Sequence, residues 1–386
     1  MAVRHGYGKI AGADALVFAY DTGDTRNSYK GEPTENLFPY PQFTNHTNNV
    51  VGAASITKKD FGDGKIGIEI IQGSTSDIIS FSMHSLSSAV SGATYTWSSY
   101  VHASKTSAVV KAQVTIRVDG VRYWLTNSNT WTTSVTECSH LFEPTVADQW
   151  HRVDTQFTMP TGTLTDFQLG GWYRNNSNYT LKLANAQLEI KSHPTQFLIG
   201  TRSATQGLLD LTGNNSIDLS NVTFDSNAQM TFDGTDDFIN TGYSQGDITT
   251  PTIEAVVYRS TSTGRYEAIV QNNLASDDAL YVYPSGILGF WPCSPSSLTV
   301  PTGQWSHVAV SYDGTDIIYS VNGVIQVTTA TCGHITDWDF LRIGAASTGD
   351  GERWVGDIAV VKIYSRALSA AEVLNNYNLY KSRFNL

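Results

Sequence analysis

The stretch Ala15-Leu16-Val17-Phe18-Ala19-Tyr20-Asp21 decides how the chain must fold. It is a continuous run of mostly apolar, strand-forming residues, and the polar segment DTGDTRNSYKGEPTENL, residues 21–37, follows it. A single strand cannot complete its own hydrogen-bond ladder or bury both of its faces, so it must join a sheet formed elsewhere. The rest of the chain has to supply that sheet.

Length and composition favour an all-β protein of two domains. The chain has 386 residues, which suits two domains that each bury a core. Charged residues make up only 15%, whereas aromatic residues reach 11% and there are 32 glycines. This mixture is typical of many short strands joined by tight turns.

Charge and hydropathy exclude two classes of partner. The formal net charge is -11 and no basic run occurs, so a nucleic-acid partner is not expected. No stretch of 18 apolar residues could span a membrane, and the N-terminus lacks the apolar region of a signal peptide. We therefore expect a protein without a membrane partner, synthesised in a cytoplasm without a signal peptide.

Three cysteines, Cys138, Cys293 and Cys332, are too few and too far apart for a zinc site or a disulfide framework. Cys293 and Cys332 either pair within one domain or remain unpaired as small hydrophobic residues, which is the commoner outcome for a sparse, odd set. The sequence leaves both alternatives open.

The C-terminal half is a series of strand-like runs that ends in one helix. Asp313-Gly314 and Asn322-Gly323 supply the turn residues that hairpins need, and such spacing predicts a jelly-roll sandwich. Ser369 followed by Glu372 forms a capping box for a short C-terminal helix. The expected strands are 252–258, 266–270, 279–283, 305–312, 316–321 and 358–364.

The middle of the chain is also a series of strand-like runs, which predicts a second β-sandwich. Several of its runs alternate apolar and polar residues, which indicates strands with one buried face. The fold class is thus all-β: two antiparallel jelly-roll β-sandwiches and one short C-terminal helix. The expected strands here are 66–71, 78–83, 94–101, 109–118, 150–157, 166–173 and 182–190.

Ordered landmarks over about residues 205–380 resemble laminin-G-like, concanavalin A-like jelly rolls. The segments MTFDGTDDFI (230–239), GQWSHVAV (303–310) and YSRALSAAE (364–372) carry the resemblance. LVFAYDTGDTRNSY (16–29) is similar to the opening strand of many phage and bacterial members, and DLTGN (210–214) is similar to the segment that shortly follows it. Here, however, these two segments lie about 180 residues apart.

The resemblance implies a domain interrupted by another domain. Residues 1–35 would hold an N-terminal arm and the first strand, 36–203 an inserted jelly roll, and 204–386 the rest of the laminin-G-like domain. An insertion at an exposed loop is tolerated because the entropy of loop closure grows slowly with length. The alternative is that residues 15–21 form an arm that docks on a virion partner.

The middle domain resembles galactose-binding-like carbohydrate-binding modules of the jelly-roll type. The resemblance rests on NLFP (36–39), WHR (150–152) and the ending AQLE (186–189), PTQF (194–197) and GTRS (200–203). That ending is similar to one found in structural proteins of tailed phages. Fold resemblance alone does not give function.

The sequence does not predict an enzyme. Glycoside hydrolases of the concanavalin A-like fold carry an ExDxxE triplet on one strand, and this sequence has none. We therefore assign no catalytic residue and no required cofactor. Calcium is the one cofactor that both resembled families often bind, and Asp233, Asp236 and Asp237 are its candidate ligands, with hairpin-turn chemistry as the alternative.

The candidate glycan-binding residues lie in one aromatic, amide-rich segment. Sugar recognition uses aromatic faces together with amide and charged side chains. Alternatively, these aromatic residues belong to the sandwich core or to strand pairs. The candidates are Trp172, Tyr173, Arg174, Asn176 and Tyr179.

These features together imply a non-enzymatic virion structural protein of a tailed bacteriophage, as a tail fibre, head fibre or decoration on the virion surface. Its expected partners are other virion proteins and host-surface glycans, with Met1–Ala13 docking on the particle and a homo-oligomer, by resemblance a trimer. Two alternatives stay open: a purely structural subunit that binds no glycan, and an extracellular carbohydrate-active enzyme or its accessory module.

Overall fold

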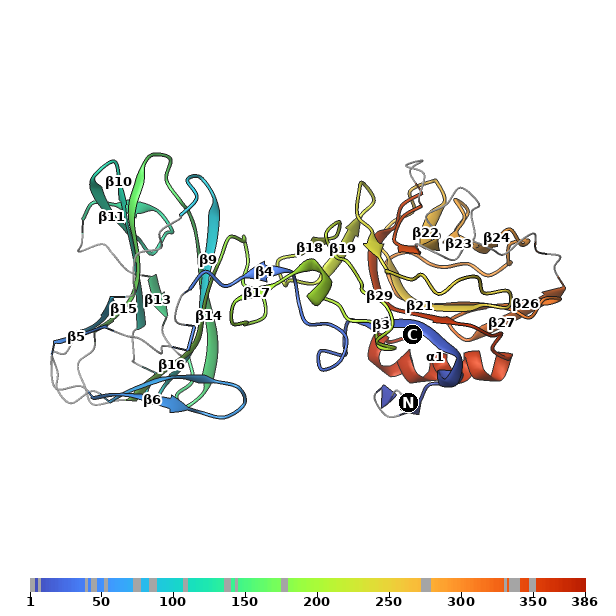
Figure 1. Ribbon diagram of the computed structural model, residues 1–386, viewed down its shortest axis with the longest axis horizontal. Helices are drawn as coiled ribbons and strands as arrows, with labels where there is room; N and C mark the ends of the chain where they lie inside the picture. The colour runs from blue at the N-terminus through green and yellow to red at the C-terminus, as the bar shows by residue number, and fades with distance from the viewer. Residues whose placement is uncertain are drawn as a thin grey trace. The chain divides into compact units, whose positions relative to one another are not determined.

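The protein forms two compact units in a computed structural model (Figure 1). Unit 1 combines Met1–Pro33 with Arg202–Leu386, and unit 2 is Thr34–Thr201. The structure describes residues 4–5, 8–38, 41–42, 47–51, 55–71, 78–82, 89–106, 110–134, 140–142, 145–174, 180–271, 279–329, 332, 341–346 and 352–386.

Unit 1 contains a large antiparallel sheet of eight strands within the described residues. Its order is β18-β19-β29-β21-β25-β26-β27, and β3 also pairs with β29. The bounds are β3 (Leu16–Asp21), β18 (Thr223–Phe224), β19 (Met230–Asp233), β21 (Thr252–Arg259), β25 (Trp305–Tyr312), β26 (Asp316–Val321), β27 (Val324–Thr329) and β29 (Val355–Tyr364).

A smaller antiparallel sheet completes the sandwich of unit 1, in the order β20-β28-β22-β23-β24. Side chains from both sheets meet in one apolar cluster, which includes Phe232 and Val308 from the large sheet and Ile269 and Phe290 from the small one. The bounds are β20 (Ile239–Asn240), β22 (Glu267–Gln271), β23 (Ala279–Val282), β24 (Leu288–Trp291) and β28 (Arg342–Ile343).

The N-terminal strand β3 is part of unit 1. It pairs antiparallel with β29, from Asp21 opposite Val360 to Leu16 opposite Tyr364. Phe18 and Tyr20 point into the core, and Ala19 is also fully buried. Both faces of β3 are therefore covered, which explains why its sequence is a continuous apolar run rather than an alternating one.

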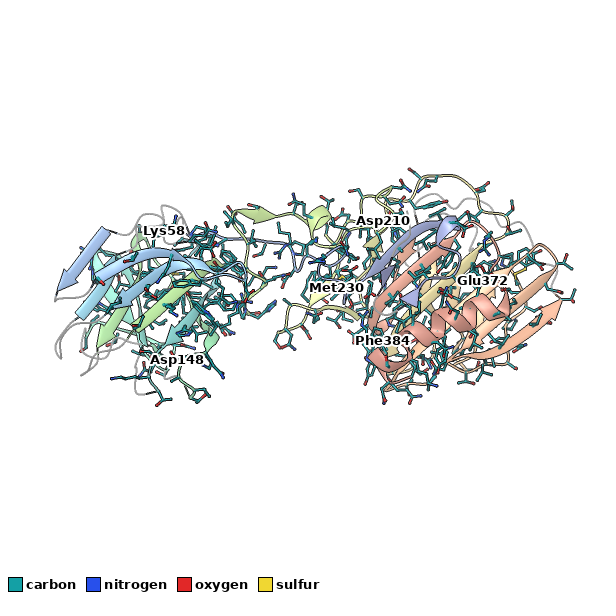
Figure 2. All side chains as sticks on the ribbon, turned by 90° about the horizontal axis from the view of Figure 1, so that it is seen from below. Lys58, Asp148, Asp210, Met230, Glu372 and Phe384 are labelled. Atoms are coloured by element: carbon teal, nitrogen blue, oxygen red, sulfur yellow. A yellow bond between two sulfur atoms is a disulfide. The ribbon has the colours of Figure 1, made fainter. Side chains whose placement is uncertain are left out.

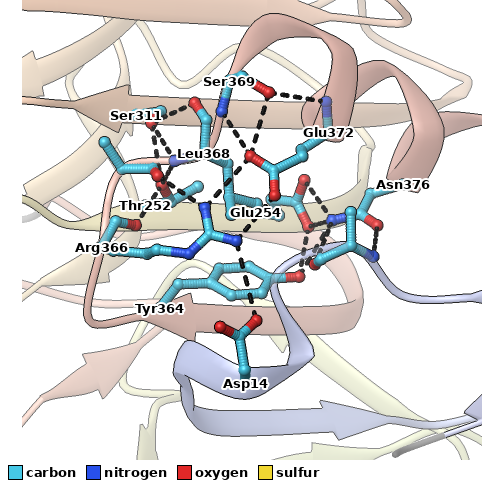
Figure 3. Close-up of polar contacts among 12 residues, drawn as sticks. Asp14, Thr252, Glu254, Ser311, Tyr364, Arg366, Leu368, Ser369, Glu372 and Asn376 are labelled. Atoms are coloured by element: carbon cyan, nitrogen blue, oxygen red, sulfur yellow. Dashed lines mark hydrogen bonds and ion pairs between the residues drawn. The ribbon is translucent and has the colours of Figure 1, made fainter.

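Helix α1 (Ala370–Phe384) packs on the outer face of the large sheet. Figure 3 shows the predicted capping box: Ser369 Oγ accepts from the Glu372 N–H at 3.3 Å, and Glu372 Oε2 accepts from the Ser369 N–H at 2.9 Å. A hydrogen bond from Arg366 lowers the pKa of Glu372 to about 2. The helix ends at Asn385, whose φ of 55° is left-handed.

A buried polar cluster lies between α1 and the sheet (Figure 3). Glu254 accepts hydrogen bonds from Tyr364 Oη at 3.0 Å and from Asn376 Nδ2 at 3.0 and 3.2 Å. Lys362 Nζ lies 3.6 Å from Glu254 Oε2, and both side chains are only 2% exposed. Burial raises the pKa of Glu254, against the opposing effect of Lys362 and of these hydrogen bonds. This pair is a charged site without contact with bulk water.

The segment before β3 packs against α1. Ile10 is 1% exposed and belongs to a cluster with Leu368 and Val373. The Ala11 N–H donates to Asn376 Oδ1 at 2.9 Å. Residues 10 and 11 of the proposed docking segment Met1–Ala13 are thus held by their own unit, and β1 (Arg4–His5) pairs with β2 (Gly8–Lys9).

The hairpin predicted at Asn322-Gly323 is confirmed. Strand β26 ends at Val321 and β27 begins at Val324, so only these two residues form the turn. Their φ angles are 50° and 79°, which is the left-handed pair that a two-residue hairpin requires.

Cys293 and Cys332 form a disulfide across 39 residues of sequence. The commoner outcome for such a sparse set, two unpaired thiols, is therefore wrong for this chain. Cys293 follows β24 and Cys332 follows β27, so the bond joins segments next to the two different sheets. No sequence spacing reports this proximity, because the fold alone creates it.

Unit 2 is a second antiparallel sandwich. One sheet has the order β12-β11-β10-β15-β8-β5 with β13 paired to β10, and the other β14-β9-β16-β7-β6. Tyr95 and Phe157 stack in its core with ring centroids 5.9 Å apart. The bounds are β5 (Thr47–Val51), β6 (Ser55–Asp60), β7 (Ile66–Ile71), β8 (Ile78–Ser82), β9 (Thr94–Ala103), β10 (Val110–Val118), β11 (Val121–Leu125), β12 (Trp131–Thr132), β13 (His140–Phe142), β14 (Trp150–Thr158), β15 (Leu164–Arg174) and β16 (Thr180–Glu189).

The predicted fold class is confirmed: both units are antiparallel sandwiches, and the described chain has one α-helix, at its C-terminus. Strands β4 (Thr34–Glu35) and β17 (Thr201–Arg202), where the chain enters and leaves unit 2, pair with each other. Within the described residues no helix is long and apolar enough to cross a bilayer.

Candidate functional site

The predicted acidic turn is present, because the carboxylates of Asp233, Asp236 and Asp237 lie within 4.8 Å of one another. Asp237 accepts hydrogen bonds from the Thr223 N–H at 2.9 Å, the Thr223 hydroxyl at 3.0 Å and the Asp233 N–H at 2.7 Å. Burial raises the pKa of Asp237, whereas a hydrogen bond from the Thr235 backbone lowers that of Asp233.

The hydrogen bonds of this turn explain its geometry without a cation. Calcium prefers six to eight oxygen ligands, and the Asp237 oxygens are already engaged by three donors that tie β18 to β19. Only Asp233 and Asp236 are exposed carboxylates. The residues present thus fit a hairpin turn better than a calcium site, and calcium binding stays a prediction.

The aromatic segment 172–179 divides into two parts. Trp172, Tyr173 and Arg174 are the last residues of β15, between β10 and β8, with Trp172 opposite Lys111 and Ser80. The strand predicted over 166–173 is thus confirmed, and it extends by one residue to Arg174. Asn176 and Tyr179 lie outside the described residues. The glycan-binding role of the segment stays a prediction.

A cavity that no sequence pattern predicted lies on unit 1, and its volume is about 220 Å³. Met230, Ile358 and Ala359 contribute apolar surface to its wall. Met230 and Phe384 are both labelled in Figure 2. The aromatic and polar side chains of the wall are Thr22, Asp225, Gln229, Trp305, Asp357 and Phe384. We call it the Trp305 cavity.

The cavity arises from a gap in the strand pairing along β29. On one side of β29, β19 pairs with Val355 and Gly356, and β3 pairs with 360–364. The residues between, Asp357, Ile358 and Ala359, have no strand on that side, and the Thr22 N–H donates to the Ala359 carbonyl at 2.9 Å. These three residues line the cavity. Two separate short strands beside one long strand therefore leave the opening.

Aromatic rings form one wall of the Trp305 cavity. Trp305, the first residue of β25, packs between Phe384 at 4.8 Å and Tyr258 at 5.6 Å, measured between ring centroids. Trp305 is partly exposed, and its indole N–H donates no hydrogen bond within the described residues. Phe384 is the last residue of α1, so the C-terminal end of the helix borders the cavity.

Two carboxylates form the polar wall. Asp225 Oδ1 accepts from the backbone N–H groups of Asn227 at 2.8 Å and Gln229 at 3.0 Å, which fixes its orientation. The carboxylate of the half-buried Asp357 makes no hydrogen bond or ion pair with any residue that the structure describes. Burial raises the pKa of Asp357, and the nearby Asp225 adds to the rise.

This arrangement suits a small polyhydroxylated ligand. Carboxylates and an amide accept hydrogen bonds from hydroxyl groups, while flat aromatic faces contact apolar C–H surface. The volume is below the range of about 300–1,000 Å³ typical of sites for drug-sized ligands, which favours one ring over a long chain.

Sequence reasoning missed the cavity because its residues come from five segments spread from Thr22 to Phe384. Trp305 lies inside the landmark segment 303–310, and Asp357 immediately precedes the predicted strand 358–364. Nothing local in those segments marks these two residues as neighbours. The interrupted domain was the available signal, because it brings the end of β3 beside β29.

Comparison with known proteins places the fold of unit 1. Residues 212–374 match the family described as the concanavalin A-like lectin/glucanases superfamily, within the laminin-G group. Unit 1 contains a concanavalin A-like jelly-roll domain. No curated protein matches the chain. The acidic turn, Trp305 and Asp357 lie within the matched residues of this concanavalin A-like domain, whereas Thr22 and Phe384 lie outside them.

Solved structures similar to this chain include domain 4 of AbnA, an extracellular GH43 arabinanase of Geobacillus stearothermophilus bound to arabinotriose. That match has 17% identity and a TM-score of 0.35, and covers 45% of this chain and 93% of that one. A Trypanosoma rangeli sialidase in complex with sialic acid matches with 12% identity and a TM-score of 0.37, and the match covers 85% of this chain and 62% of that one. The binding domain of botulinum neurotoxin serotype D matches with 14% identity and a TM-score of 0.34, and the match covers 46% of this chain and 49% of that one. The chain thus spans less than two thirds of the latter two chains.

Proposed function

We propose that the protein is a non-enzymatic structural protein of a tailed-bacteriophage particle whose concanavalin A-like domain binds glycans on the host surface. The Trp305 cavity carries the glycan part of this proposal, because its lining combines a tryptophan with two carboxylates and an amide. The phage part is supported by the opening segment 16–29 and by the ending 186–203 of unit 2, which resemble phage proteins.

The particle role implies protein partners besides the glycan. As a tail fibre, head fibre or decoration, the chain would contact other virion proteins and form a homo-oligomer, with a trimer suggested by resemblance. The N-terminal residues before Ile10 are the segment proposed for docking on the particle. A second candidate, a subunit that builds the particle without binding glycan, is favoured by the structural account of the acidic turn.

Replacing Trp305 by alanine is expected to weaken glycan binding about tenfold, since an aromatic contact contributes about 1.5 kcal/mol. Binding of the full chain to a glycan array, followed by titration of the best ligand, measures this. Trp305→Phe keeps an aromatic face and should retain most of the affinity. Tyr266→Ala, which removes an aromatic residue that is 41% exposed in the turn before β22, is the matched control.

Three results of this experiment contradict the proposal. A wild-type chain that binds no glycan but is incorporated into particles favours the purely structural subunit. If Trp305→Ala and Tyr266→Ala lose the same amount of affinity, the Trp305 cavity is not the glycan-binding site. Release of reducing ends from the bound glycan would show an enzyme, since two carboxylates in one cavity are also the equipment of glycoside hydrolases.

A further inference from the structure

The hydrogen-bonding inventory of the Trp305 cavity is unbalanced toward acceptors. Ionised aspartates accept hydrogen bonds and cannot donate them. Thr22, Gln229 and Trp305 can each donate, but the described lining residues include no lysine, arginine or histidine. The ligand must therefore bring donors. Hydroxyl groups satisfy this need, and a protonated amine satisfies it better because its hydrogen bonds to a carboxylate are charge-assisted.

The negative charge at the cavity has no cation of its own. Asp357 has no ion pair in the described part of the chain, and it faces a second carboxylate, Asp225. The nearest cation on α1, Arg383, is already bound to Asp21, with Nη1 at 2.7 and 2.8 Å from its two oxygens. Its guanidinium also lies 4.5 Å from the Phe384 ring centroid. A ligand cation would relieve the repulsion between the half-buried Asp357 and the exposed Asp225.

The aromatic wall favours the same ligand. An ammonium group over or beside an indole face is attracted by the quadrupole of the ring, and the attraction grows as water is excluded. Trp305 is partly exposed and is one of the residues that line the cavity. Charge and ring thus select for the same chemical group on a sugar.

We propose that the Trp305 cavity selects glycans that carry a free amine, with the ammonium bound by Asp225 and Asp357 and the sugar ring against Trp305. This inference rests on the proposed function and adds the ligand class to it. Acidic sugars are rejected by the same carboxylates, since like charges that meet in a partly buried site repel. N-acetylated sugars carry no ammonium charge, so the cavity should not prefer them over neutral sugars.

Titration calorimetry of the full chain with three oligosaccharides of one backbone tests this: β-1,4-linked glucosamine, its N-acetylated form, and β-1,4-linked glucose. At about pH 6 the amine is largely protonated. We expect the amine-bearing oligomer to bind at least about tenfold tighter than the other two. Asp357→Asn keeps the shape of the side chain and should abolish this preference, because the affinity for the amine-bearing oligomer should fall much further than the affinity for the neutral one.

Asp63→Asn provides the charge-matched control, because Asp63 is exposed in unit 2 and its left-handed φ of 51° suits asparagine. It should leave all three affinities unchanged. A chain that binds the oligomers through Trp305 without preferring the amine overturns the inference and leaves the proposed function intact. A chain that binds no glycan at all overturns both. If calcium chloride alone binds to the wild-type chain and Asp357→Asn abolishes that binding, the carboxylates form a metal site and the inference is overturned.

Discussion

Lys362→Met is expected to lower the free energy of unfolding of unit 1 by about 3–5 kcal/mol at pH 7, because it leaves the buried Glu254 without its cation. The two side chains are each only 2% exposed, and Nζ lies 3.6 Å from the carboxylate. Glu254 must then stay charged without a partner or take up a proton. Protonating an ordinary glutamate at pH 7 costs about 4 kcal/mol, which gives the same magnitude independently.

The pH dependence gives this prediction its sign. Burial already raises the pKa of Glu254, and removing Lys362 removes an opposing effect. The folded variant therefore binds a proton that the unfolded chain releases above about pH 4.3. The loss in its free energy of unfolding, relative to the wild-type chain, thus grows with pH above that value and shrinks below it. Urea unfolding at several pH values measures the deficit.

Two further variants make the test specific. Lys381→Met changes an exposed lysine on α1, the helix that covers the buried pair, and should alter the free energy of unfolding by less than about 0.5 kcal/mol. The double variant Glu254→Gln/Lys362→Met retains an amide able to bond with Tyr364 and Asn376, and should recover most of the loss. A Lys362→Met chain as stable as Lys381→Met would contradict the buried pair.

Removing the disulfide is expected to lower the free energy of unfolding of unit 1 by about 4 kcal/mol. A bond across 39 residues restricts the unfolded chain, and the loop-entropy relation gives this magnitude at that length. Urea unfolding of the wild-type chain with and without a thiol reductant measures it, and Cys293→Ser/Cys332→Ser should match the reduced protein.

The same reductant serves as the control, because it should not change the stability of the double serine variant. If wild-type unfolding is identical with and without reductant while free-thiol titration finds no disulfide, the pairing of Cys293 with Cys332 is wrong. If the bond is present but its loss changes nothing, the denatured state retains structure that replaces the constraint.

Local signals in the sequence were sufficient for much of the fold. The capping box at Ser369 and Glu372 and the turn at Asn322-Gly323 depend on neighbouring residues, and both form as predicted. The run Leu16–Asp21 predicted a strand in need of a sheet, and β29 is its partner. Such features are predictable because their physical causes lie within a few residues of chain.

What the sequence could not predict depends on contacts between distant segments. Lys362 is one polar residue in a predicted strand, and nothing nearby in the sequence reveals that Glu254 and the Tyr380 ring lie against it. The disulfide and the Trp305 cavity have the same origin. Trp172 illustrates the converse, because the strand predicted around it follows from the local strand propensity of aromatic residues and forms as expected.

The cavity and the interrupted domain share one requirement, the pairing of β3 with β29, since Thr22 reaches the cavity wall only through it. Amide hydrogen exchange of the full chain, followed by mass spectrometry of peptides covering 16–21 and 355–364, measures this pairing directly. We expect the amides of both segments that bond within the sheet to exchange together, in the slowest class of unit 1. Exchange of residues 16–21 at the rate of an unstructured peptide, with 355–364 still protected, would contradict the account.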